Sequence, residues 1–238
     1  MSTTSLLVRC RRELRFTIDR LIDWRWRIDT HPGTSALSDK VGKFEDAAQN
    51  IPVSYYLLFR LVGRTVFKPD DVFYDIGCGD GRVLCYVARK RISKVIGIEL
   101  SPAVAAQARK NATELRGRVS SIEVRCGDAV EMDYSDGTVF FLYHPFGPGT
   151  LHAVLDRIRK SVERHQRPIL IMYQNPVHSS VFRLSGWPKY VGRREAFLSK
   201  QQMELWAYEG PTELNDTAKI QLLPPQTLAS ETPPARTP

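Results

Sequence analysis

The sequence predicts an α/β fold: a doubly wound, mostly parallel sheet of seven strands, with an antiparallel final strand and an N-terminal helical extension. Short apolar runs alternate with helical patterns between residues 72 and 173, which is the order of a parallel sheet with helices on both faces. Two strand-like runs, 190–192 and 203–208, follow without a long helix between them, so at least one should pair antiparallel. Glycines cluster directly after the first strand, as at a turn into a helix.

The size and charge of the chain set limits on its class. Its 238 residues, 42% of them hydrophobic and 25% charged, suit one sizeable domain with extra segments at the ends. The net charge of +8 favours acidic partners such as nucleic acid, an anionic membrane or an acidic protein. A solvated basic surface explains the same charge equally well. The oligomeric state cannot be read from these numbers.

Several classes of protein are disfavoured. The four cysteines form no C-x-x-C pair, and no His/Cys cluster has zinc-ligand spacing, so we expect no metal site. Reduced thiols and a cytoplasmic location are expected. The longest apolar stretch, 53–67, is interrupted by Arg60 and Arg64 and is too short to span a membrane. The N-terminus has an apolar run before its arginines, the reverse of a secretory signal.

Residues 1–50 are predicted to form a basic, helical N-terminal arm. Apolar residues between 14 and 22 recur at helical spacing, with arginines among them. Trp24, Trp26 and Ile28 then alternate, which is more typical of a strand. The arm is either a lid or substrate arm, or an amphipathic helix that packs on the main domain with its tryptophans as anchors.

Residues 51–209 are predicted to form the main domain, and the Pro/Thr-rich segment 210–238 a disordered tail. A helical pattern from Lys43 to Val62 is interrupted near Pro52, which suits the first turn of a helix. The predicted strands are 72–76, 95–99, 121–125, 138–143, 169–173, 190–192 and 203–208. The predicted helices after residue 62 are 82–91, 102–115, 149–164 and 177–184.

The glycine turn Gly77-Cys78-Gly79-Asp80-Gly81 is the predicted ligand site, because glycine leaves backbone N–H groups open to a ligand. A dinucleotide-binding turn has the spacing G-x-G-x-x-G. Here the spacing is G-x-G-x-G, and Asp75 and Asp80 would repel a pyrophosphate. An NAD-dependent oxidoreductase is therefore disfavoured. The same carboxylates suit a ligand with cationic groups.

The run from Asp75 to Gly81 matches the signature D-x-G-x-G-x-G in full. Residues 71–208 thus resemble the class I S-adenosylmethionine-dependent methyltransferases, which have a seven-stranded, Rossmann-like sheet. The resemblance implies S-adenosylmethionine as cofactor and hydrogen bonds from its ribose to Glu99. The other residues that it places at the cofactor are Asp75, Gly77, Cys78, Gly79 and Gly81, with Leu100, Asp128 and Ala129 around the adenine.

The fourth strand ends in Tyr143-His144-Pro145-Phe146, which is similar to the (Asn/Asp)-Pro-Pro-(Tyr/Phe) motif of methyltransferases that act on nitrogen. The resemblance implies catalytic positions at His144, Pro145 and Phe146. His144 departs from the motif: one imidazole nitrogen could orient an amine or take its proton, but it cannot both donate and accept as an amide does. The alternative is that His144 only supports the loop. Asn175, after the fifth strand, either helps to hold the substrate or simply ends the strand.

A narrower resemblance concerns Asp75 to Arg82 together with Pro52-Val53-Ser54-Tyr55. These stretches are similar to small lysine methyltransferases of the mitochondrial carrier and ATP-synthase c-subunit type, and more distantly to non-SET histone lysine enzymes. The methyl acceptor stays open among protein, small molecule and RNA. The alternative function is a non-catalytic module of the same fold that binds RNA or protein through its basic arm. Intact acids at Asp75, Glu99 and Asp128 favour the enzyme.

Overall fold

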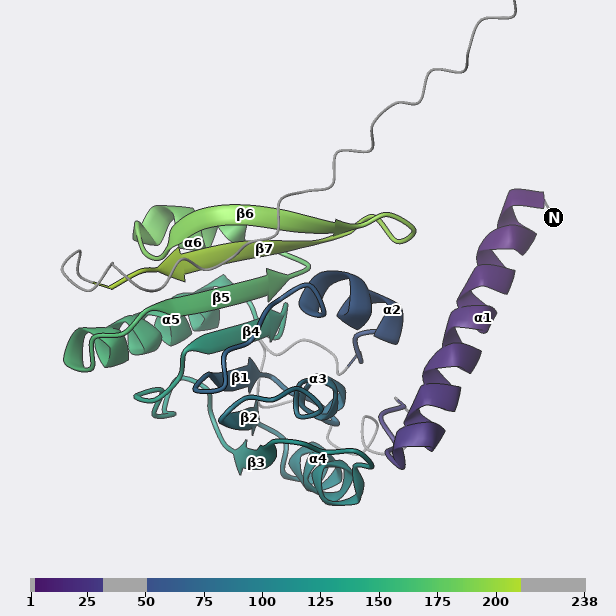
Figure 1. The fold of residues 1–238 in the computed structure, drawn as a ribbon. Helices are drawn as coiled ribbons and strands as arrows, with labels where there is room; N and C mark the ends of the chain where they lie inside the picture. Colours follow the sequence, from purple (N-terminus) through teal and green to yellow (C-terminus); the bar gives the residue numbers. More distant parts are fainter. Residues whose placement is uncertain (1–2, 32–50, 211–238) are drawn as a thin grey trace, which may run out of the picture.

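A twisted sheet forms the centre of the computed structural model, which describes residues 3–31 and 51–210 (Figure 1). The strand order is β3-β2-β1-β4-β5-β7-β6. The first five strands are parallel, and β7 pairs antiparallel with both β5 and β6. The predicted fold class is confirmed. The strands are β1 (Val72–Ile76), β2 (Lys94–Glu99), β3 (Ser121–Cys126), β4 (Val139–Tyr143), β5 (Ile169–Gln174), β6 (Lys189–Ala196) and β7 (Gln201–Tyr208).

Helices cover both faces of this sheet. Ser101 caps α4 by accepting a hydrogen bond from the Val104 N–H, and Pro102 opens the helix, as the sequence predicts. Helix α3 ends at Val87, four residues before its predicted end. Strand β6 is longer than predicted because it pairs with β7 along most of its length. The helices are α1 (Thr3–Trp26), α2 (Tyr55–Leu57) with the π-helical turn η1 (Leu58–Val62), α3 (Arg82–Val87), α4 (Pro102–Glu114), α5 (Pro148–Arg164) and α6 (Ser179–Ser185).

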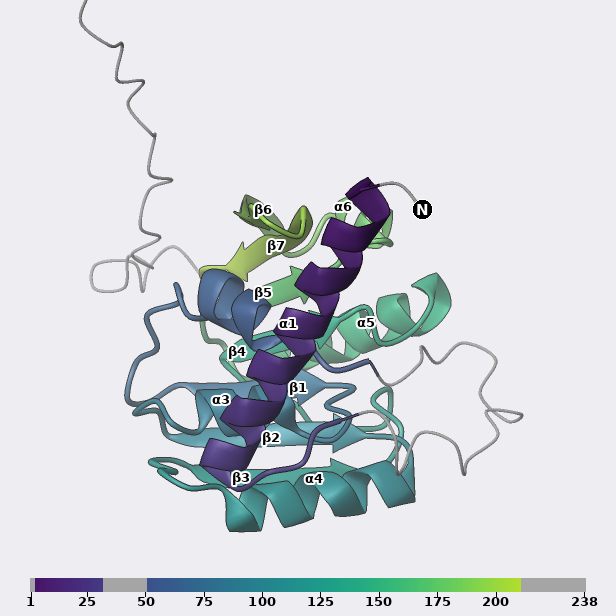
Figure 2. The same ribbon diagram turned by 90° about the vertical axis from the view of Figure 1, so that its right-hand side faces the viewer.

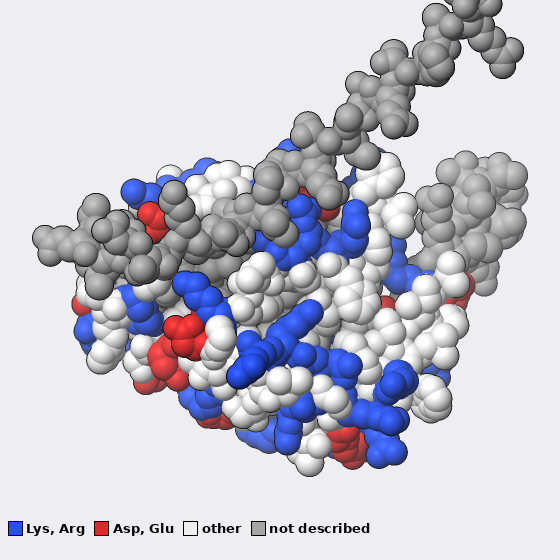
Figure 3. All heavy atoms as spheres, in the orientation of Figure 1, with Lys and Arg blue, Asp and Glu red and all other residues white. Residues whose placement is uncertain are grey.

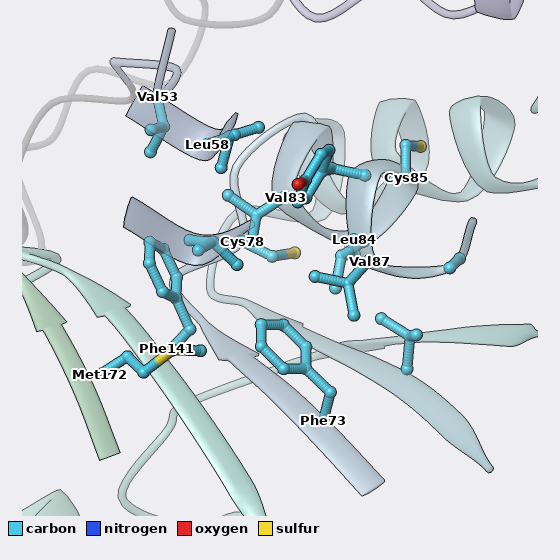
Figure 4. Close-up of a cluster of buried hydrophobic side chains, with 14 of the residues drawn as sticks. Val53, Leu58, Phe73, Cys78, Val83, Leu84, Cys85, Val87, Phe141 and Met172 are labelled. Atoms are coloured by element: carbon cyan, nitrogen blue, oxygen red, sulfur yellow. The ribbon is translucent and has the colours of Figure 1, made fainter. Parts of the chain in front are cut away.

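Two hydrophobic cores lie on opposite faces of the sheet. Successive strand residues point to opposite faces, so Phe73 of β1 belongs to one core and its neighbour Tyr74 to the other. Figure 4 shows the first core, where Phe73 and Phe141 rise from the sheet toward Val87 and Leu58. Helices α5 and α6 supply the second core. A sheet covered on both faces leaves the carboxyl ends of its parallel strands as the place for a ligand.

Helix α1 packs on the main body through its C-terminal half, and its N-terminal end extends away from the sheet (Figures 1 and 2). The strand predicted from the alternation of Trp24, Trp26 and Ile28 is wrong. The helix runs to Trp26, where Arg27 adopts a left-handed φ of 60°. The Ile28 N–H then bonds back to the Asp23 carbonyl at 3.0 Å. This turn buries Trp26 and Ile28 but leaves Trp24 77% exposed, so the alternation reflects a helix end.

Some predictions fall outside the described residues: the helical pattern from residue 43 to 50, and the tail from 211 onward. Within 3–31 and 51–210, no helix is long and apolar enough to cross a bilayer. In those same ranges no group of three or more acidic, His or Cys side chains could hold a metal. Lys and Arg lie in several separate groups over the face in Figure 3, with smaller groups of Asp and Glu between them.

Candidate functional site

In the glycine turn after β1, every second residue has a left-handed backbone conformation. Gly77, Gly79 and Gly81 have φ values of 78°, 54° and 83°, which side chains other than glycine rarely adopt. The Gly77 and Cys78 N–H groups both donate to the Ile98 carbonyl at 2.9 Å, which ties the turn to β2. A Cβ on Gly77 would lie 2.5 Å from the Cβ of Pro145. The turn and the corner after β4 are therefore in contact.

A cavity of about 290 Å³ lies between this turn and the ends of β1, β2 and β4. Ten of the twelve predicted site residues line it. The two others are Gly81, which forms the N-cap of α3, and His144. The ten that line the cavity are Asp75, Gly77, Cys78, Gly79, Glu99, Leu100, Asp128, Ala129, Pro145 and Phe146.

Two acids of the cavity, Asp75 and Glu99, form no ion pair among the described residues. Asp75 is 2% exposed, and its buried Oδ2 has no hydrogen-bond partner among the described residues. Burial, followed by the charge of Glu99, raises the pKa of Asp75 well above its ordinary value. Glu99 accepts backbone N–H bonds from Gly79 and Ser101, each at 3.0 Å. Burial outweighs these bonds and raises the pKa of Glu99 as well.

Two further residues of the cavity, Asp128 and Cys78, differ in their exposure and contacts. Asp128 is exposed, and its Oδ1 accepts the Val130 N–H at 2.9 Å. Cys78 is buried, and burial raises the pKa of its thiol well above the ordinary value. A thiol held in its protonated form is a poor nucleophile. Cys78 is therefore not a candidate nucleophile, although it lines the cavity.

The N-terminal segment supplies a wall of the cavity that the sequence interpretation missed. Thr30 and the stretch 51–53 line the cavity together with Arg82, the residue after the glycine turn. Arg82 is 3% exposed. A buried guanidinium requires both hydrogen bonds and opposite charge. The position of the arginine therefore depends on what the N-terminal segment offers.

Two acids of α1 and the segment that follows provide these partners. Arg82 Nη1 lies 3.1 Å from Asp19 Oδ2, and Nη2 lies 3.3 Å from Asp23 Oδ2. Arg82 Nε donates to Thr30 Oγ1 at 2.6 Å, and the two Nη groups also donate to the carbonyls of Val53 and Thr30. We call these five residues the Arg82 network. A pair of acids four residues apart on a helical pattern was the one available signal for it.

Tyr55 donates two further hydrogen bonds to the acids of the Arg82 network. Its hydroxyl donates to Asp23 Oδ1 at 2.5 Å, and its backbone N–H donates to Asp19 Oδ1 at 3.0 Å. The Arg82 guanidinium also stacks over the Tyr55 ring, 4.9 Å from its centre. Asp19 and Asp23 therefore each accept several hydrogen bonds within the protein. In contrast, Oδ2 of Asp75 accepts none from the described residues.

The corner after β4 supplies the remaining wall. Tyr143, Pro145 and Phe146 line the cavity, and Phe146 is 9% exposed. His144 lies between them with a left-handed φ of 41°. Its ring centre is 5.1 Å from that of His178, a residue that the sequence interpretation did not consider. Burial, followed by the charge of His178, lowers the pKa of His144.

The residues present fit a ligand that carries positive charge at one end. An orphaned buried carboxyl oxygen calls for a donor or a cation. The bare backbone at Gly77 and Gly79 lets such a ligand approach closely. Apolar walls at Ile98 and Leu100 suit a flat ring system. S-adenosylmethionine, with its ammonium, sulfonium and adenine, has this distribution of charge.

Comparisons with known proteins agree with this description. A family model described as a methyltransferase domain matches residues 73–165. A protein-lysine N-methyltransferase of Saccharolobus islandicus (strain REY15A) is 27% identical over 145 residues, which are 59% of this chain and 81% of that protein. A histone-lysine N-methyltransferase of Dictyostelium discoideum, specific for H3 lysine 79, is 31% identical over 117 residues. The match covers 44% of this chain and only 6% of that protein.

A solved structure supports the fold alone. It is a protein of the NADB-Rossmann superfamily from Streptococcus agalactiae, 14% identical, with a TM-score of 0.53 over 68% of this chain and 71% of that one. The matched family model spans β1 to α5, which are the elements that carry the glycine turn and the β4 corner. We conclude that the chain is a class I S-adenosylmethionine-dependent methyltransferase, an enzyme whose cofactor is S-adenosylmethionine.

Proposed function

We propose that this methyltransferase acts on an amine nitrogen, and that lysine side chains of proteins are its substrate class. The observation that carries the proposal is the likeness to a protein-lysine N-methyltransferase over 81% of that relative's length. The second relative, which is matched over a much smaller share of its length, is also named as a lysine methyltransferase. The residues matched by the methyltransferase family model, 73–165, include the β4 corner, where the acceptor would meet the transferable methyl.

The composition of the β4 corner supports an amine. The cavity wall there consists of Tyr143, Pro145 and Phe146, which carry no charge. Aromatic rings attract ammonium and methylammonium groups through cation–π interactions. Burial, followed by the charge of His178, lowers the pKa of His144 beside this wall, which favours the neutral imidazole. A neutral imidazole nitrogen can accept a hydrogen bond from an amine N–H and so orient the acceptor.

The proposal assigns the cofactor residues as follows. Asp75 faces the cationic methionine end, where its Oδ2 needs a donor. Each oxygen of Glu99 already accepts one backbone N–H and keeps a second lone pair, so the carboxylate can accept the two ribose hydroxyls. Leu100 and Ala129 pack on the adenine, and Asp128 accepts from its exocyclic amine.

When bound, S-adenosylmethionine supplies a methyl group activated by the sulfonium. The task of the protein is then to hold the acceptor nitrogen about 3–3.5 Å from that methyl, in line with the bond that breaks. Pro145 and Phe146 give this position its shape, and the contact between Pro145 and Gly77 fixes the corner relative to the cofactor turn. His144 orients the amine by accepting a hydrogen bond from it at the neutral imidazole nitrogen.

The experiment that tests the proposal uses purified protein, S-adenosylmethionine labelled at the methyl, and a lysate from cells that lack this protein. We expect acid hydrolysis of the labelled protein fraction to release methylated lysine. Label confined to RNA, to small molecules or to base-labile carboxyl esters would contradict a lysine substrate. The Asp75→Asn variant, whose cofactor affinity should be about 10- to 100-fold lower, serves as the control for labelling by contaminating enzymes when the cofactor is kept near its wild-type dissociation constant.

A further inference from the structure

The connection between β6 and β7 carries two large apolar side chains that the cofactor site does not use. Phe197 and Leu198, its first two residues, are 86% and 64% exposed. We call these two residues the hairpin tip. The turn does not need their side chains, because the backbone N–H groups of Ser199 and Lys200 close it by donating to the Ala196 carbonyl at 3.1 and 3.0 Å. Adjacent apolar side chains exposed at a turn, where small and polar residues are usual, indicate an interaction site.

The hairpin tip lies at the same end of the sheet as the cofactor cavity. Strand β7 runs antiparallel to β5, and Met203 near its start pairs with Gln174 at the end of β5. The Asn175 N–H, just past β5, donates to the Gln202 carbonyl at 3.0 Å. Gln174 is also the register partner of Tyr143, which lines the cavity. Figure 1 accordingly shows the β6–β7 connection at the end of the sheet to which the β5 arrow points.

A second connection joins the hairpin tip to another wall of the cavity. The Leu198 N–H donates to the Tyr56 hydroxyl at 3.1 Å. Tyr56 belongs to α2, and the stretch just before that helix, 51–53, lines the cavity. Ile51 of this stretch is exposed as well, so it presents apolar surface to the cavity and to the outside. The hairpin tip is therefore held beside the segment that forms the rim of the cavity.

We propose that the hairpin tip is a docking surface for the acceptor protein, and that it selects lysines with a bulky apolar side chain close by. This inference rests on the proposed function, since it assumes a protein acceptor. It goes further by assigning the choice of acceptor to residues outside the cavity. An acceptor that places a lysine in the cavity must also lie over the surface around the cavity rim. The acceptor itself is therefore the partner that covers the tip.

The chemistry of the tip indicates how the acceptor is held. The side chains of Phe197 and Leu198 have no polar atoms, so their gain on binding comes from excluding water at an apolar contact. The alternative would be pairing of an extended acceptor with β6, the last strand in the sheet order. That strand exposes Lys189, Arg193 and Glu195, and charged side chains on an edge strand disfavour the addition of another strand. Side-chain contact at the tip is therefore the favoured mode.

The test uses the full chain with both tip residues changed, Phe197→Ser together with Leu198→Ser, and the lysate proteins as acceptor. Serine keeps the backbone N–H that bonds to Tyr56. Leu184→Ser is the matched control, because Leu184 is also 86% exposed but lies on α6, near the start of β6 at the opposite end of the sheet. Thermal unfolding is compared first. Phe197→Ser alone, at the more exposed position, replaces the double variant if the latter is unstable.

We expect the acceptor concentration that gives half the maximal rate to rise about tenfold or more in the double Ser variant. The rate at saturation and the affinity for S-adenosylhomocysteine should stay within about twofold of wild type, because only binding of the acceptor is lost. Leu184→Ser should match wild type. Phe197→Leu with Leu198→Ile keeps an apolar tip and should retain most of the acceptor binding. Mass spectrometry should find Leu, Ile, Phe or Met enriched near the lysines that wild type methylates.

Several outcomes would overturn the inference. These are an unchanged half-maximal concentration in the double Ser variant, an equal rise in Leu184→Ser, or methylated lysines without apolar neighbours. Light scattering and flotation with phosphatidylserine vesicles test other occupants of the tip. A wild-type dimer, or vesicle binding, that the double Ser variant loses would assign the tip to a second copy or to a membrane instead. If wild type itself labels no lysine in the lysate, the proposed function fails first, which is a distinguishable outcome.

Discussion

Two pairs of acids, Asp19 with Asp23 and Asp75 with Glu99, lie near the glycine turn, and their surroundings differ. Asp19 and Asp23 are 4% and 2% exposed, and both contact the guanidinium of Arg82. Asp75 is equally buried, but the charged side chain that affects its pKa is Glu99, which is also an acid. Asp19 and Asp23 have donors and a counter-charge within the protein, whereas Oδ2 of Asp75 has no hydrogen-bond partner among the described residues. The first two acids therefore have a structural role, and Asp75 has an oxygen left for a ligand.

The same comparison explains why one arginine in the cavity wall is no sign of an anion site. Arg82 lines the cavity beside the glycine turn, where an arginine would suit a phosphate. Its donors are already taken by Asp19, Asp23, Thr30 and Val53. The charge left facing the cavity is therefore negative, which matches a cationic cofactor.

The largest loss of stability is expected when Asp19 and Asp23 lose the positive charge of Arg82. Arg82→Met leaves two buried acids without a counter-charge, and removing one partner of a buried ion pair costs about 3–5 kcal/mol. Urea unfolding should show a loss of that order in the free energy of unfolding. Arg159→Met removes an exposed pair with Glu163 on α5 and should cost less than about 0.5 kcal/mol. Equal losses in the two variants would remove the basis of the comparison.

Substitution of Asp75 should have the opposite effect on the free energy of unfolding. Asp75→Asn removes a buried charge that has no partner, so the free energy of unfolding should stay unchanged or rise. Cofactor binding should weaken about 10- to 100-fold, since a hydrogen bond to a charged group contributes ~1.5–3 kcal/mol. Isothermal titration calorimetry measures the affinity. Asp19→Asn is the matched control, for which we expect lower stability. A destabilised Asp75→Asn would place this acid with the structural pair.

The raised pKa of Asp75 also predicts a pH dependence. The free folded protein holds the proton on Asp75 more tightly than the unfolded chain, so stability is greatest below the unfolded pKa and falls as pH rises through the folded one. Binding of a cationic ligand requires the ionised form. Affinity for S-adenosylmethionine should therefore rise with pH through the same range, by at most about tenfold per pH unit. Asp75→Asn should flatten this slope, and an unchanged slope would assign it to another group.

The smallest effect on stability is expected from the loss of the Tyr55 hydroxyl, which donates to Asp23. Tyr55→Phe removes one hydroxyl donor from Asp23, which keeps its bonds from Arg82 and from the N–H and hydroxyl groups of Thr30. We expect a loss of about 1 kcal/mol in thermal unfolding. Cofactor affinity should change little, because Tyr55 does not line the cavity. A large loss of affinity with unchanged stability would show that the network acts directly on the cofactor.

Local patterns in the sequence predict the sheet and most of the predicted site residues that line the cavity. Strand and helix periods are local, and the glycine turn must follow β1, so both could be read without coordinates. Asp75 and Glu99 end adjacent strands, and the carboxyl ends of parallel strands meet at one edge. The acids of the pocket could therefore be placed in three dimensions from their order alone.

The parts that the sequence did not reveal depend on distant contacts. The Arg82 network joins residues about 60 positions apart, and nothing in the local pattern of α1 says which of its acids face the body. The strand expected around Trp26 was wrong because a helix that ends in a left-handed residue also buries alternate side chains. His178 was missed because its neighbour His144 lies on another element, 34 residues earlier in the sequence.

The separation between Asp23 and Arg82 also has a consequence for synthesis on the ribosome. Helix α1 is made first, and its acids must wait for an arginine that follows Asp23 by 59 residues. At about 5–20 residues per second, that delay is roughly 3–12 s. During this time Trp26 and Ile28, which are buried in the finished fold, have no body to pack against. We therefore expect the nascent helix to be the stretch of this enzyme most dependent on chaperones.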